Sequence, residues 1–206
     1  TWTRRYPGGA SLAITAPTDA LYAACEVNEA AWELAVARLT GEPEPHPVDR
    51  LIQEIAREQD PAVTALRAAA EQRGVTCLAD DEIVSVGLGR GSRSWPVGEL
   101  PHPDEVDWEP IRDIPVALVT GTNGKTTTVR MLASIARAAG LAAGNTSTDG
   151  VQVGGSTVLP GDYTGPEGAR ALLRNPGVDM AFLETARGGL LRRGLPVSKA
   201  NAACVT

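Results

Sequence analysis

Hydrophobic positions near the start of the chain recur at helical spacing. The first such stretch lies between Thr18 or Asp19, either of which can cap a helix, and Gly41, where we expect the helix to end. The positions expected to face a core are Leu21, Cys25, Trp32, Val36 and Leu39. This pattern predicts an amphipathic helix with one buried apolar stripe.

Two further helices are predicted after a proline-rich break. Residues 42–47 contain three prolines and predict a linker. A second helix is expected over residues 48–58. A third begins after Asp60, which can cap it, with a proline in its first turn. Val63 and Leu66 share one face of the third helix, and Gly74 lies past its end.

Two short strand patterns, 75–78 and 83–86, follow on either side of an acidic turn. The glycine-rich residues 87–92 come next and resemble a nucleotide loop. The residues after them do not open a helix, so we favour a hairpin or a close approach of backbones. Prolines and carboxylates alternate without apolar periodicity over residues 99–110, which predicts a linker.

Strand and helix patterns alternate more regularly in the second half. The expected elements are a strand at 115–119, a helix from 125 to about 139, a strand near 141–144, a hairpin at 151–158, a helix at 165–173 and a strand that ends at Glu184. This order implies a parallel sheet. We therefore predict an α/β fold, a mostly parallel sheet flanked by helices, in residues 112–206. A linker at 99–111 would join it to a smaller α+β region of unknown role, residues 1–98.

The stretch Gly-Thr-Asn-Gly-Lys-Thr-Thr-Thr, residues 121–128, stands between a predicted strand and a predicted helix. Glycines let backbone amides turn toward an anion, a lysine ammonium reaches outer phosphates, and an adjacent hydroxyl can hold Mg²⁺. The pattern predicts a loop that binds a nucleoside triphosphate. The residues expected to bind it are Gly121, Thr122, Asn123, Gly124, Lys125, Thr126 and Thr127.

The general phosphate-loop pattern requires a glycine five residues before the Gly-Lys pair, where this chain has Val119. The short form instead resembles the ATP loop of the Mur ligase family. Three later stretches occur in the order expected for that family: 146–150, 161–166 and 184–195. The last of them, Glu-Thr-Ala-Arg-Gly-Gly-Leu-Leu-Arg-Arg-Gly-Leu, is specifically similar to the Mur-ligase-type half of cyanophycin synthetases and their relatives.

This resemblance implies an ATP-dependent ligase that joins a carboxylate to an amine through an acyl phosphate, with ATP and Mg²⁺ bound by this chain. Lys125 and Glu184 are the expected catalytic residues, and Thr126 and Glu184 the expected metal ligands. Glu184 follows a predicted parallel strand, at the sheet edge where ligands collect in open α/β sheets. The alternative for Glu184 is a carboxylate that caps the next helix.

Thr146, Thr148 and Asp149 match positions where the family places substrate-facing polar groups, and Arg187 is a further candidate that could contact an acidic substrate or phosphate. Thr146, Thr148 and Asp149 are also ordinary turn formers. Arg192 and Arg193 are expected on a solvated helix end, although a contact with phosphate or an acidic substrate stays open. His46 and His102 lie in proline-rich stretches, so we expect no catalytic or metal role for them.

Composition narrows the classes of function. The 206 residues are 43% hydrophobic, enough for one large or two small domains, and the net charge of −6 does not suggest a surface for nucleic acid or membranes. Three separate cysteines fit small apolar residues better than ligands or disulfides. With no secretion signal, we expect a cytoplasmic protein.

We also expect the chain to be a fragment of a longer ligase and to be inactive by itself. This chain would supply the ATP and Mg²⁺ half-site, and the substrates would be small-molecule or peptide-like carboxylates and amino-acid amines. A naturally short paralogue is the alternative. Two other functions stay open: a nucleotide-binding or regulatory module without catalysis, and a phosphate-loop kinase or ATPase, which Val119 disfavours.

Overall fold

The computed structural model describes residues 2–17 and 19–206, except for the side chains of residues 191–193. The chain divides into two compact units, one that ends at Thr64 and one that begins at Ala65. Each unit is described by itself.

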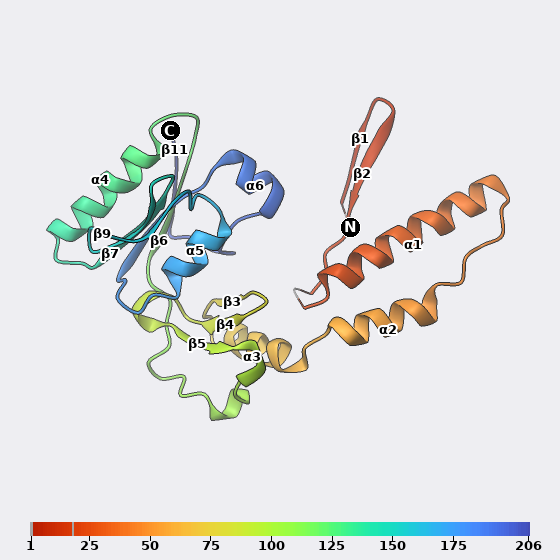
Figure 1. Cartoon of the computed structure of the whole chain (residues 1–206), viewed down its shortest axis with the longest axis horizontal. Helices are drawn as coiled ribbons and strands as arrows, with labels where there is room; N and C mark the ends of the chain where they lie inside the picture. Colours follow the sequence, from red (N-terminus) through yellow and green to blue (C-terminus); the bar gives the residue numbers. More distant parts are fainter. Residues whose placement is uncertain (1, 18) are drawn as a thin grey trace. The chain divides into compact units, whose positions relative to one another are not determined.

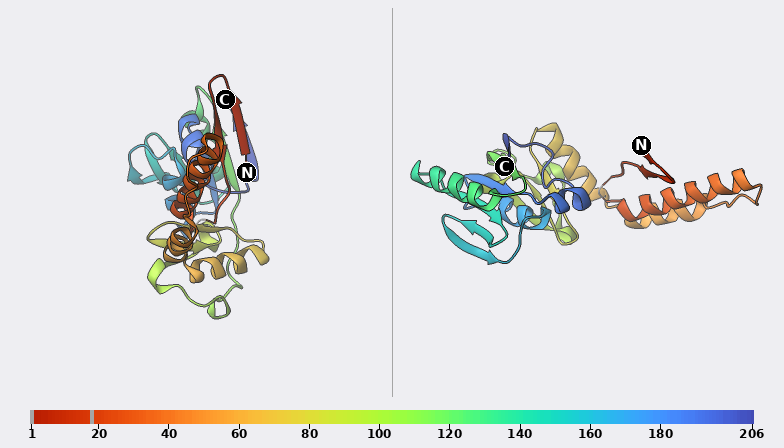
Figure 2. Two further views of the ribbon diagram at one scale, coloured as in Figure 1. Left: turned by 90° about the vertical axis from the view of Figure 1, so that its right-hand side faces the viewer. Right: turned by 90° about the horizontal axis from the view of Figure 1, so that it is seen from above.

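The first unit contains a β-hairpin and two antiparallel helices. Strands β1 (Trp2–Tyr6) and β2 (Gly9–Ala13) pair with each other, and every residue of both is exposed. Helices α1 (Leu21–Thr40) and α2 (Val48–Glu58) run side by side in opposite directions (Figures 1 and 2). The helices and the break between them agree with the sequence-based prediction, whereas the hairpin was not foreseen.

The buried stripe of α1 differs from the prediction. The large apolar residues expected to face a core are exposed, with Trp32 at 62% and Leu39 at 87%. The buried positions are Ala23, Ala30 and Ala37, one at every seventh residue. Small alanines allow close helix packing, so the helical period was right and the choice of face was wrong.

The start of α1 is capped by a residue that is distant in sequence. The Glu58 carboxylate, at the end of α2, accepts hydrogen bonds from the amides of Tyr22 (2.8 Å) and Ala23. Asp19 does not cap α1, because it accepts bonds from the Thr64 hydroxyl (2.7 Å) and the Asp60 amide. Thr18, the other expected cap, lies outside the described residues.

Helix α3 (Pro61–Gln72) begins as predicted. The Asp60 carboxylate accepts hydrogen bonds from the amides of Ala62 (2.9 Å) and Val63 (3.2 Å), which are free in the first turn of a helix. Val63 and Leu66 are buried, at 7% and 0% exposure. The boundary between the two units falls within this helix.

A three-stranded antiparallel sheet follows, formed by β3 (Cys77–Ala79), β4 (Ile83–Val86) and β5 (Arg93–Pro96). The glycines between β4 and β5 allow other backbone segments to approach this loop closely. A methyl group added to Gly87, Gly89 or Gly91 would lie within 2.4 Å of a backbone oxygen elsewhere in the chain. The hairpin and the close approach of backbones that the sequence favours are therefore both observed.

The second sheet has six strands in the order β11-β6-β10-β7-β8-β9 (Figure 1). The four strands β11, β6, β10 and β7 are parallel, and β8 and β9 continue the sheet as an antiparallel hairpin. The bounds are β6 (Val116–Thr120), β7 (Ala143–Ser147), β8 (Gly150–Val153), β9 (Ser156–Pro160), β10 (Met180–Glu184) and β11 (Ala202–Val205). The predicted mixed α/β fold with a mostly parallel sheet is confirmed, and the hairpin expected at 151–158 forms the last two strands of the sheet.

Helices cover both faces of this sheet. Helix α4 (Lys125–Ala138) buries Val129 and Ala133 against Val119 and Phe182 on one face. Helix α5 (Pro166–Leu173) packs on the other, where Leu172 shares a cluster with Leu183. Helix α6 (Arg187–Arg193) follows β10 at the carboxyl edge.

The compact units divide the chain at a different place from the predicted domain limits of 1–98, 99–111 and 112–206. Leu78 and Leu88 share a core with Val116 and Leu183, so the small sheet packs with the large one. The expected linker is also packed, since Val106 is 9% exposed and the Arg73 guanidinium lies over the Trp108 ring, 4.4 Å from its centroid. Its irregular proline-rich backbone hides these contacts from an analysis of periodicity.

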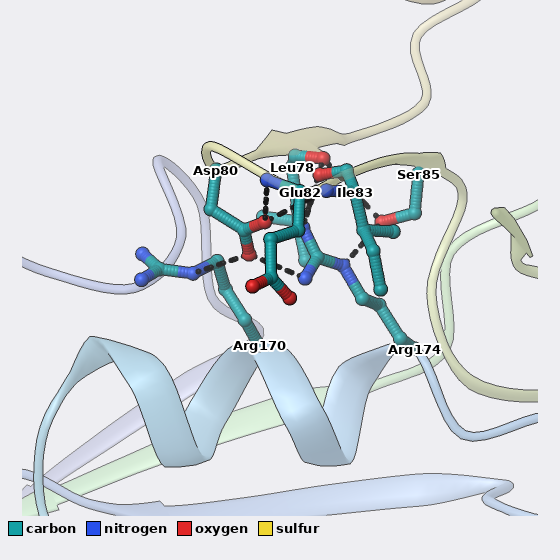
Figure 3. Close-up of polar contacts among 7 residues, drawn as sticks. All are labelled: Leu78, Asp80, Glu82, Ile83, Ser85, Arg170 and Arg174. Carbon is teal, nitrogen blue, oxygen red and sulfur yellow. Dashed lines mark hydrogen bonds and ion pairs between the residues drawn. The ribbon is translucent and has the colours of Figure 1, made fainter. Parts of the chain in front are cut away.

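Arg174 joins the small sheet to α5 (Figure 3). Its guanidinium donates to the Asp80 carboxylate, the Ser85 hydroxyl (3.2 Å) and the Ile83 carbonyl (2.9 Å). Burial raises the pKa of the Asp80 carboxyl, but hydrogen bonds from Arg174 and from two backbone amides, together with the Arg174 charge, outweigh burial and lower it. The interaction stabilises the charged form of Asp80.

Among the described residues, no helix combines the length and the apolar character that crossing a membrane requires.

Candidate functional site

The glycine-rich loop, residues 121–124, leads from β6 directly into α4. Gly121 has φ +140° and Gly124 has φ +81°, conformations that side-chain-bearing residues rarely adopt. The first intrahelical bond runs from the Thr128 amide to the Gly124 carbonyl (2.8 Å), so the amides before it form the free amino-terminal turn. The Lys125 ammonium folds over the loop and donates to the Gly121 carbonyl (2.9 Å).

Thr126 and Glu184 meet at the carboxyl edge of the sheet. The Thr126 hydroxyl donates to a Glu184 carboxylate oxygen at 2.8 Å, although the two residues are 58 positions apart. Glu184 is only 3% exposed. Helix α6 begins at an Ala186 cap without a side-chain hydrogen bond, so Glu184 does not take the alternative role of a helix cap.

Thr206, which follows β11, contacts the glycine-rich loop. Its amide continues the pairing with β6 by donating to the Thr120 carbonyl (2.9 Å), and its carbonyl accepts from the Thr122 amide (3.2 Å). Its hydroxyl donates to the Asn123 carbonyl. The sequence did not point to this residue, because a threonine at a strand end has no distinctive pattern.

Strand β7 contains two buried polar side chains, Asn145 and Thr146, and the sequence pointed only to Thr146. Within the described part of the chain, Asn145 Nδ2 and Thr146 Oγ1 lack a hydrogen-bond partner. Alternation along β7 places Asn145 with Ala143 on the α4 face, which also carries Glu184, and Thr146 on the α5 face. Asn145 was missed because the strand predicted near 141–144 ends before it, whereas β7 runs over Ala143–Ser147. Thr146 is not brought to Thr126 and Glu184.

The other residues expected to face substrate are exposed at the same edge. Thr148 and Asp149 form the turn between β7 and β8, and Asp149 pairs with Arg130 of α4. Arg187 is exposed at the first position of α6. Arg192 and Arg193 lie outside the residues whose side chains are described.

The arrangement offers ligands for a phosphorylated molecule with a hard metal ion. The amino-terminal turn of α4 and Lys125 supply positive charge, and Thr126 and Glu184 supply the hydroxyl and carboxylate oxygens that Mg²⁺ prefers. No cluster of three or more histidine, cysteine, aspartate or glutamate residues suited to a metal occurs in the described residues. This donor set suits Mg²⁺, which is commonly held by one or two protein groups plus substrate phosphates.

Comparisons with known proteins concern the second half of the chain. A family model described as the Mur ligase middle domain matches residues 119–206. A cyanophycin synthetase from Trichormus variabilis is 52% identical over 92 residues, which are 45% of this chain and 10% of that protein. A cyanophycin synthetase from Geminocystis herdmanii is 51% identical over 111 residues, 54% of this chain and 12% of that protein.

A more distant relative is the UDP-N-acetylmuramoyl-L-alanyl-D-glutamate--2,6-diaminopimelate ligase of Leptospira interrogans, with 34% identity over 86 residues, 39% of this chain and 17% of that protein. The matched region therefore spans a small part of the length of each relative. The resemblance to the Mur ligase family and to cyanophycin synthetases is confirmed for this region.

Proposed function

Because residues 119–206 match the Mur ligase middle domain, we propose that this chain supplies the ATP and Mg²⁺ half-site of an ATP-dependent carboxylate–amine ligase. The observation that carries the proposal is the hydrogen bond between Thr126 and Glu184 beside the glycine-rich loop. The relatives, named as a cyanophycin synthetase and as a ligase, support the class of reaction.

The loop residues 121–124 and the first turn of α4 bind the triphosphate. Free amides of the turn, from Asn123 to Thr127, point their partial positive charges toward phosphate oxygens. Lys125 exchanges its contact with the Gly121 carbonyl for the β and γ oxygens. The Thr122 amide, which was expected to join the cradle, is engaged by the Thr206 carbonyl in this structure.

Thr126 and Glu184 hold Mg²⁺. When bound, the ion neutralises charge on the transferring phosphoryl group. The burial of Glu184 fixes its carboxylate at the sheet edge, so little reorganisation is needed when the metal arrives. Asn145, one strand away on the same face, has a free amide donor that suits a phosphate oxygen or a metal-bound water.

The substrates bind over the carboxyl edge, near Thr148, Asp149 and Arg187. Asp149 offers a carboxylate to the amine and Arg187 a guanidinium to an acidic group. Both side chains are exposed, and Asp149 would exchange its ion pair with Arg130 for the substrate amine. The fully buried Thr146 supports the turn that carries Thr148 and Asp149.

The reaction proceeds through an acyl phosphate. A carboxylate oxygen attacks the γ-phosphorus, the bond to the β–γ bridging oxygen breaks, and ADP leaves. The amine then attacks the acyl carbon, and inorganic phosphate departs with a proton lost from nitrogen. The residues of this chain contribute alignment and charge neutralisation, not covalent catalysis.

Calorimetric titration of the chain with MgATP tests the nucleotide site. We expect saturable binding that Lys125→Ala abolishes and that Lys199→Ala, a charge-matched change at an exposed position, leaves intact. The phosphate-loop assignment fails if Lys125→Ala binds MgATP as the unsubstituted protein does.

Because this chain is proposed to supply only a half-site, product analysis of the longer ligase that contains it tests the class of reaction. With a mixture of amino acids and acidic peptides, a ligase forms ADP and phosphate only when both substrates are present, and hydroxylamine traps the acyl phosphate as a hydroxamate. Substrate-independent formation of ADP would indicate an ATPase instead. Binding of MgATP without product under every condition would indicate a regulatory module.

A further inference from the structure

Thr206 occupies a place in the nucleotide site that no feature of the sequence indicates. Strand β11 pairs in parallel with β6, and Val205 lies opposite Thr120. The next residue of each strand therefore leaves the sheet at the same point. Gly121 begins the glycine-rich loop there, and Thr206 lies directly against it.

The backbone contact between Thr206 and the loop is close. A methyl group added to Gly121 would lie 2.0 Å from the Thr206 carbonyl oxygen and 2.7 Å from its amide nitrogen. The Thr206 carbonyl also accepts the Thr122 amide at 3.2 Å. These contacts restrict the path that residues 121 and 122 can follow.

The Thr206 side chain adds a contact that its backbone cannot make. Its hydroxyl donates to the Asn123 carbonyl and lies 3.3 Å from the Thr120 carbonyl. A hydroxyl has one hydrogen to donate, so it serves the nearer Asn123. The bond orients the peptide between Asn123 and Gly124, whose amide belongs to the loop that faces the phosphates.

We propose that Thr206 is a positioning residue of the phosphate-binding loop, whose hydroxyl holds the Asn123 carbonyl so that the following amides face the nucleotide. Thr206 does not touch the nucleotide itself. The inference rests on the proposed function, because it assumes that the loop binds phosphate.

The test compares Thr206→Val, which removes the hydroxyl and keeps the shape, with Thr206→Ser, which restores the hydroxyl. The control is Thr157→Val, the same change on β9 at the opposite edge of the sheet. We expect the dissociation constant for MgATP to rise about threefold to tenfold in Thr206→Val, as for the loss of one hydrogen bond. Thr206→Ser and Thr157→Val should bind like the unsubstituted protein.

Thermal unfolding of the same variants separates positioning from folding. A positioning role predicts an affinity that falls in Thr206→Val while the melting temperature in the absence of nucleotide changes little. Unchanged affinity in Thr206→Val, or a loss that Thr206→Ser does not restore, overturns the inference. If the unsubstituted protein fails to bind MgATP, the proposed function fails instead.

Hydrogen exchange replaces the titration if Thr206→Val does not fold. In the unsubstituted chain the Thr122 amide, bonded to the Thr206 carbonyl, should exchange more slowly than the Asn123 amide. Equal exchange at the two amides would show that Thr206 does not restrain the loop.

Discussion

The Thr126 hydroxyl and the Glu184 carboxylate, on different secondary-structure elements, are joined by a hydrogen bond of 2.8 Å. Helix α4 supplies the first residue and the end of β10 the second. Because β10 lies between β6 and β7 in the sheet, its carboxyl end is held close to the start of α4. The position of the two oxygens is thus set by the order of the strands.

Glu184→Gln should remove the effect of Mg²⁺ on nucleotide binding. Glutamine keeps an oxygen that accepts from Thr126, so the fold is retained, but it lacks the charge that binds the metal. We expect apparent Mg²⁺ affinity to fall at least about tenfold, with ATP binding in EDTA unchanged. Titrations of ATP at several Mg²⁺ concentrations measure this. Glu99→Gln, at an exposed turn, is the matched control, and equal losses with and without Mg²⁺ would contradict the metal assignment.

Gly121→Ala should abolish MgATP binding, because the added methyl group would lie 2.0 Å from the Thr206 carbonyl oxygen. Gly140→Ala is a useful comparison, since Gly140 has φ +83° and no atom within 4 Å of the added methyl group. It should cost about 1–2 kcal/mol of stability from backbone strain alone and retain binding. Calorimetry and thermal unfolding of both variants check these outcomes. Normal affinity in Gly121→Ala would mean that the loop tolerates displacement.

Asp80→Asn should weaken the attachment of the small sheet to α5. The folded-state pKa of Asp80 lies below that of the unfolded chain, so its stabilisation is present above about pH 4 and is lost as pH falls through the folded pKa. We expect a loss of about 1.5–3 kcal/mol at pH 7 and a smaller loss in acid. Urea unfolding at several pH values measures both. Asp81→Asn, at the exposed neighbour, should show neither effect, and a loss for Asp80→Asn that is independent of pH would contradict the prediction.

Glu58→Ala should loosen the start of α1 by removing the acceptor for the Tyr22 and Ala23 amides. Loss of a capping side chain costs about 0.5–2 kcal/mol. Hydrogen exchange should therefore be faster at these two amides. Glu29→Ala, an exposed substitution within α1, should leave them protected. Unchanged exchange in Glu58→Ala would show that the carboxylate is not the cap.

Local patterns were sufficient to predict much of the second unit. The strand before the loop, helix α4 and the strand that ends at Glu184 each carry their own periodicity and boundary residues. Val119, the position where the general phosphate-loop pattern has glycine, is fully buried beside Phe182. The valine side chain packs in the core at this position. The short form of the motif, residues 121–128, does not require a glycine there and was therefore the form that pointed to the loop.

The features that were missed depend on contacts between distant segments. Periodicity alone cannot show that α1 buries alanines instead of Trp32 and Leu39, because either stripe has helical spacing. The contribution of Thr206 to the loop follows only from the pairing of β11 with β6. The buried Asn145 amide likewise becomes informative once its neighbours are known.

The site also connects ligand binding with folding kinetics. Asn123 meets Thr206 across 83 positions of sequence, and Thr126 meets Glu184 across 58. Closing such long loops is entropically costly, and parallel strand pairings of this kind form slowly. Because both contacts favour nucleotide binding, a partly paired sheet should bind ATP less tightly, and the rise in ATP affinity during refolding should follow the pairing of β11 with β6.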